Sequence, residues 1–217
     1  EAGVVENTDK MFASVGVGDK EYKLLAKVSD FTKDGWKLEA LRNENATLVP
    51  GGKLEKDAFL TNKDGRKIGV IIRNLSDKNQ KVSDCIVTKL SFSKEMFDGQ
   101  ITLPGSLGFD STEKELKAAG FKKDADGIYT YTSKKIKDDT IKAAMADGES
   151  VSEFTLERAV DESSTSTGNA AANTSASTAA GSATTTASDS SSAEQNSVTA
   201  DTTLTNNSNS ASDSAEE

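Results

Sequence analysis

Residues 67–74, KIGVIIRN, carry apolar side chains at every second position, at Ile68, Val70 and Ile72. Such alternation is typical of a β-strand with one buried face and one solvent-facing face. The stretch 151–159, VSEFTLERA, alternates in a similar way. Together the two stretches predict antiparallel sheet with a single buried face.

Turn-forming residues divide the sequence around these stretches into further short strands. Segments 11–17 and 22–28 flank the turn GDKE, which predicts a hairpin, and the turn KDGR joins 57–62 to the strand at 67–74. Strands are also expected at 81–92, 100–104, 127–133 and 140–146. A helical alternative for 136–146 lacks both a cap and a clean apolar stripe.

Two short helices are expected between the strands. The first, in VSDFTKDGW at 28–36, has Ser29 as its expected cap. The second, TEKELKAAG at 112–120, starts with Thr112 followed three residues later by Glu115, which is the pattern of a capping box. The same pattern argues against a phosphate cradle in SLGFDSTEKELKAAGF, because the free N–H groups are used within the helix.

A glycine and an aromatic residue close both predicted helices, in Gly35-Trp36 and Gly120-Phe121. Glycine permits the left-handed conformation that ends a helix, and the aromatic side chain can fold back on it. This likeness fits a duplicated unit, or two halves that converged on the same cap. The predicted fold is α+β, with two tandem units of a short helix on an antiparallel meander sheet.

The expected organisation of the chain follows from these units and from a change of composition near residue 161. We expect a flexible N-terminus at 1–10, units at 11–96 and 97–161, and a disordered tail at 162–217. The last 56 residues hold 15 Ser, 11 Thr and 12 Ala, with no aromatic residue and no Lys or Arg. Such a segment buries too little apolar surface to offset the entropy of ordering it.

Charge and composition exclude several classes of function. The formal charge is −9, and taking away the seven acidic residues of the tail leaves −2 for the rest. A nearly balanced body with scattered Lys is not a nucleic-acid surface, so no nucleic-acid partner is expected. With no His and one Cys, Ser-His and Cys-His catalysis and a structural zinc site are excluded, and no cofactor or catalytic residue is expected.

Two further motifs are expected to be turns. GVGDKE at 16–21 has Glu21 where a dinucleotide fingerprint needs its third glycine. DADG at 124–127 resembles part of a calcium loop, but the flanking positions Lys122 and Ser133 are unsuitable ligands.

Three aromatic residues are candidates for a binding face, namely Trp36, Tyr129 and Tyr131. Tyr129 and Tyr131 share one face of a strand and could form a flat platform, or else pack in the core. Cys85 is expected to be a buried, inert thiol within the strand 81–92.

The segment ITLPGSLGFDSTEKELKAAGF, followed by YTY and VSEFTL, resembles Gram-positive surface lipoproteins and modules of the β-lactamase-inhibitor-protein type. The resemblance implies a helix packed on antiparallel sheet, often in tandem. It implies an extracellular or cell-surface protein, and with Glu1 as first residue we expect a lipid-modified Cys upstream.

The expected function is a monomeric, non-enzymatic binding or structural module. Its expected partner is an extracellular macromolecule or a component of the cell envelope. The alternative is a secreted enzyme inhibitor, or an enzyme with a site that the sequence does not reveal.

Overall fold

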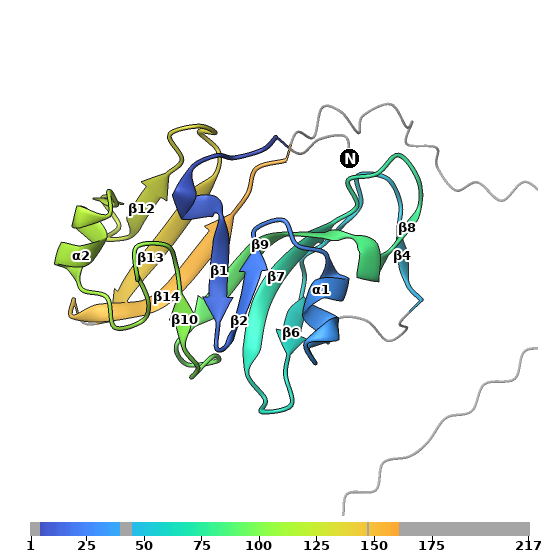
Figure 1. Ribbon diagram of the computed structural model, residues 1–217, viewed down its shortest axis with the longest axis horizontal. Coiled ribbons are helices and arrows are strands. Elements are labelled where there is room, and N and C mark those ends of the chain that lie inside the picture. Colours follow the sequence, from blue (N-terminus) through green and yellow to red (C-terminus); the bar gives the residue numbers. More distant parts are fainter. Residues whose placement is uncertain (1–4, 40–44, 147, 161–217) are drawn as a thin grey trace, which may run out of the picture. The chain divides into compact units, whose positions relative to one another are not determined.

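The computed structural model describes residues 5–39, 45–146 and 148–160 (Figure 1). Over these residues the chain forms antiparallel sheets and two short α-helices, which confirms the predicted α+β class. The segment 162–217, predicted to be a disordered tail, lies outside the described residues.

The larger sheet contains nine of the described strands. They are β3 (Lys37–Leu38), β5 (Lys53–Leu54), β6 (Phe59–Thr61), β7 (Lys67–Arg73), β9 (Ile86–Ser93), β11 (Lys122–Lys123), β12 (Tyr129–Thr132), β13 (Thr140–Ala146) and β14 (Ser150–Glu157). The order is β11-β12-β13-β14-β9-β7-β6-β3, and β5 also pairs with β7. Every pairing is antiparallel.

The two predicted units meet inside this sheet, through the pairing of β9 with β14. Phe92 lies opposite Phe154, and Leu90 lies opposite Leu156. All four side chains are buried and belong to one apolar cluster that draws on both halves of the described chain. The sheet therefore continues across the predicted boundary between residues 96 and 97.

The remaining described strands form two smaller sheets. They are formed by β1 (Ser14–Val17), β2 (Lys20–Lys23) and β10 (Ile101–Thr102), and by β4 (Thr47–Leu48) with β8 (Gln80–Lys81). The predicted hairpin is present as β1 and β2, with a tighter turn at Gly18 and Asp19. Since β10 pairs with β1, each predicted unit supplies strands to the same small sheet.

Helix α1 (Val28–Lys33) differs from its prediction at its first turn. Ser29 is inside the helix, and Lys27 occupies the cap position. The Asp30 carboxylate accepts a hydrogen bond from the Lys27 N–H at 3.1 Å, so a side chain in the first turn replaces the expected serine cap. Phe31 faces the small sheet, where its ring stacks on Tyr22 with centroids 4.2 Å apart.

Helix α2 (Glu113–Ala118) has the predicted capping box. The Thr112 hydroxyl accepts from the Glu115 N–H, and the Glu115 carboxylate accepts from the Thr112 N–H at 2.8 Å. Gly120 closes the helix with a φ of 100°, and Phe121 packs against Tyr131 with ring centroids 5.6 Å apart. The donors at this helix start are therefore used internally, as the sequence predicts.

The predicted strand 81–92 is interrupted near its start. Val82–Asp84 form a 3-10 turn, and β9 begins at Ile86. Cys85 therefore precedes the strand rather than lying in it, but its side chain is fully buried as expected.

We predict that Phe92→Ala destabilises the whole described body by about 3–5 kcal/mol, because it removes a large buried side chain at the pairing between the halves. Urea unfolding followed by far-ultraviolet circular dichroism and by tryptophan fluorescence should give one shared transition at lower urea. Lys142→Ala, an exposed change in β13, is the control. Two separate transitions would show that the halves fold independently.

Candidate functional site

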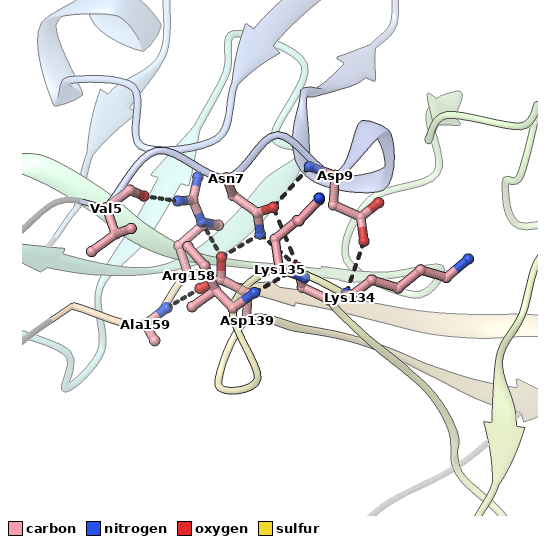
Figure 2. Close-up of polar contacts among 10 residues, drawn as sticks. Val5, Asn7, Asp9, Lys134, Lys135, Asp139, Arg158 and Ala159 are labelled. Atoms are coloured by element: carbon pink, nitrogen blue, oxygen red, sulfur yellow. Dashed lines mark hydrogen bonds and ion pairs between the residues drawn. The ribbon is translucent and has the colours of Figure 1, made fainter.

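A buried ion pair lies where the two ends of the described body meet (Figure 2). Arg158 follows β14, and its Nε lies 2.6 Å from Oδ2 of Asp139 in the loop before β13. The side chains are only 6% and 0% exposed. Charges withdrawn from water in this way require hydrogen bonds on their remaining polar atoms.

Those remaining hydrogen bonds come from both ends of the described body. The Asp139 carboxylate also accepts from the Asn7 amide and from the Ala159 N–H, each at 2.6 Å. Arg158 donates through Nη2 to the carbonyl of Val5 at 2.8 Å. Figure 2 shows the N-terminal segment and the end of the last strand converging on this pair. We call Val5, Asn7, Asp9, Ser133, Asp139 and Arg158 the terminal junction.

Asp9 provides a second set of contacts in the terminal junction. Its carboxylate accepts from the Tyr131 hydroxyl at 3.0 Å and from the Lys134 N–H at 3.1 Å. Burial raises the pKa of Asp9, but hydrogen bonds from Lys134, Met11 and Tyr131 lower it by more, and the net pKa lies below the ordinary value.

These contacts depart from the predicted flexible N-terminus. Residues 1–4 lie outside the described residues, whereas Val5, Asn7 and Asp9 are hydrogen-bonded to segments more than 120 positions away. Sequence reasoning missed the junction, although one signal was present. Arg158 continues the face of Phe154 and Leu156 by period-two alternation, so the strand pattern itself places a charge against the core.

We predict that Asp9→Asn lowers the free energy of unfolding at pH 7 by about 1–2 kcal/mol, since it removes charge-assisted hydrogen bonds from a half-buried carboxylate. Because folding lowers the Asp9 pKa, its contribution is present above the unfolded-state pKa of about 4 and is lost as the pH falls through the folded-state value. The gap between wild type and variant should therefore shrink below about pH 4 in urea titrations. A gap of constant size from neutral to acidic pH would contradict this assignment.

A cavity lies beside β10, away from the terminal junction. Its volume is 880 Å³, which is within the range of ligand-binding clefts. The walls are formed by residues 97–102 and 106–111, together with Lys94 and Glu115. The floor is apolar, with the buried side chains of Ile101, Leu107 and Phe109.

A second cavity of 320 Å³ shares Phe97, Gly99 and Gln100 with the first. Its other walls come from the β1–β2 turn, the end of α1 and the β6–β7 turn. The two cavities therefore have residues of one chain segment, 97–100, as a common wall. We call them together the groove.

The groove and the terminal junction lie at opposite ends of β9. The Arg158 N–H donates to the Thr88 carbonyl near the start of the strand, whereas Lys94 and Phe97 follow its last residue, Ser93. At about 3.3 Å per residue, roughly 17 Å of strand separate Thr88 from Ser93. In Figure 1, β10 and the β1–β2 and β6–β7 turns lie along the lower side, while the segments before β1 and after β14 lie along the upper side.

The three aromatic residues predicted for a binding face lie in the core. Trp36, Tyr129 and Tyr131 are 7%, 1% and 6% exposed. Trp36 stacks on Phe97 with centroids 6.3 Å apart, and Tyr131 packs on Phe121. Their rings do not form an exposed platform, and core packing is the use that the structure gives Tyr129 and Tyr131, whereas Trp36 also lines the smaller cavity.

The remaining sequence candidates are structural. Burial and, to a lesser degree, the Asp84 charge raise the pKa of the Cys85 thiol to about 11, so it is an unreactive thiol at neutral pH. The Asp124 carboxylate accepts from the N–H groups of Asp126 and Ile128, which makes DADG a turn. Within the described ranges, no three His, Cys, Asp or Glu side chains gather in a way that could hold a metal ion.

The described part of the chain also contains no helix with the length and apolar character needed to cross a membrane. Comparisons with protein-family models, with curated proteins and with solved structures found no match.

Proposed function

We propose that this chain is a non-enzymatic binding module of the cell surface, produced as a lipoprotein of a Gram-positive bacterium. The observation that carries the proposal is the separation of the groove from the terminal junction. An anchor reached through the N-terminal segment would hold the junction toward the envelope, and the groove would face outward.

The tail sequence supports the same orientation. It begins at Glu162, four residues after Arg158 of the terminal junction, and is rich in Ser and Thr. If the tail is disordered, as its composition predicts, its typical end-to-end distance would be roughly 40 Å and it would serve as a spacer. The segments that lead away from the two ends of the described body therefore do not have to cross the groove, which stays free for a ligand.

Cosedimentation of the full chain with purified Gram-positive cell walls tests this proposal, because a single added cysteine can be blocked selectively. Cys85 is buried and has a raised pKa, so a bulky maleimide polymer should react with the added thiol alone. We expect conjugation at Thr102→Cys, in the groove, to abolish wall binding. Conjugation at Thr132→Cys, an exposed site next to Ser133 of the terminal junction, should leave it intact.

Failure of the unmodified chain to bind walls would overturn the proposal. Equal loss of binding from the two conjugates would also overturn it, because the groove would not then be the binding end.

A further inference from the structure

The groove presents polar side chains that the protein itself does not use. Gln100, Thr102 and Ser106 are exposed around the larger cavity, and their side chains have no hydrogen-bonding partner among the described residues. Amide and hydroxyl groups of this kind both donate and accept hydrogen bonds. They surround an apolar floor, so a matching ligand has polar groups at its rim and an apolar face.

Several charged side chains of the groove have partners within the protein. Arg66 holds Asp98 at 2.7 Å and Asp64 at 3.6 Å. Lys20 lies 3.5 Å from Asp34, and Glu115 is engaged in the capping box of α2.

Four charged side chains of the groove remain without such a partner. They are Asp19, Lys63, Lys94 and Asp110. Over both cavities the lining has four cationic and six anionic side chains, and this net charge of −2 disfavours an anionic ligand but is small for the recognition of a polycation.

The main chain beside the groove is already paired, which argues against an extended peptide. On one side β10 pairs with β1, with Thr102 opposite Gly16. On the other side the Leu103 N–H donates to the Leu107 carbonyl at 2.8 Å, and Gly108 packs against the Ile101 carbonyl. A Cβ at Gly108 would lie 2.8 Å from that oxygen. A peptide strand would find no open edge of β10 to extend.

We propose that the groove binds an uncharged oligosaccharide, with Gln100 and Thr102 as its principal contacts. Sugar hydroxyls match the unused amide and hydroxyl groups, and the C–H faces of sugar rings match the floor of Ile101, Leu107 and Phe109. Two neighbouring cavities with shared wall residues suit a chain of several sugars rather than a single one. This inference rests on the proposed function, because it names the ligand class of the same binding end.

The test is a titration of the isotope-labelled full chain with soluble cello-, chito- and malto-oligosaccharides, followed by amide chemical shifts. At least one series should shift the Gln100 side-chain amide and the backbone of residues 97–111. The double variant Gln100→Ala/Thr102→Val should weaken that binding by about tenfold or more. Both positions are exposed, so the variant should unfold at the same urea concentration as wild type.

Asn79→Ala/Thr132→Val is the matched control, since it removes one exposed amide and one exposed hydroxyl outside the groove. The inference is overturned if none of the three series binds, if the shifts lie outside the groove, or if both double variants bind equally. Wall binding that is lost on blocking Thr102→Cys, without binding of any oligosaccharide, would reject the sugar ligand and leave the proposed function standing.

Discussion

The buried pair of Arg158 and Asp139 is the contact on which the arrangement of both ends of the described body depends. Burying two charges is costly unless their geometry is good and their other polar atoms are bonded. Here Asn7, Val5 and Ala159 supply those bonds. The N-terminal segment thus supplies hydrogen bonds that water would otherwise make to this ion pair. Both ends of the described body are held at the terminal junction.

As a consequence of this constraint, the terminal junction and the groove lie at opposite ends of β9. The start of the strand lies beside the terminal junction, and its end leads into segment 97–100 between the two cavities. Between them, Leu90 and Phe92 pack opposite Leu156 and Phe154 and bind the two halves into one core. Strand β9 therefore connects the terminal junction to the groove.

Patterns between near neighbours in sequence predicted much of the fold. The alternation of KIGVIIRN and the capping box at Thr112 and Glu115 are confirmed because both depend on local geometry. The terminal junction was not predicted, because it joins Asn7 to a residue 132 positions away and depends on tertiary contacts alone. Likewise, nothing local places the β1–β2 turn beside Gln100, although a hydrogen bond from Gly18 joins them.

The groove was not predicted from the sequence. The loop SLGFDS attracts attention through its glycine and hydroxyl groups, and the donors of the following helix are indeed used internally. The same loop nevertheless forms a wall of the cavity beside β10, since Gly108 allows close approach to Ile101. Trp36, Tyr129 and Tyr131 were predicted as binding residues because aromatic side chains are common at interfaces. They are equally common in cores, and the sequence alone does not distinguish the two environments.

The most direct measurement is the free energy of unfolding of Arg158→Met, combined with hydrogen exchange of the amides between Val5 and Lys10. Leaving Asp139 buried without its partner should cost about 3–5 kcal/mol, and the N-terminal amides should lose protection. The double variant Arg158→Met/Asp139→Leu should recover part of that loss, because no unpaired charge remains buried. A change within about 0.5 kcal/mol, with unaltered protection of the N-terminal amides, would contradict the account.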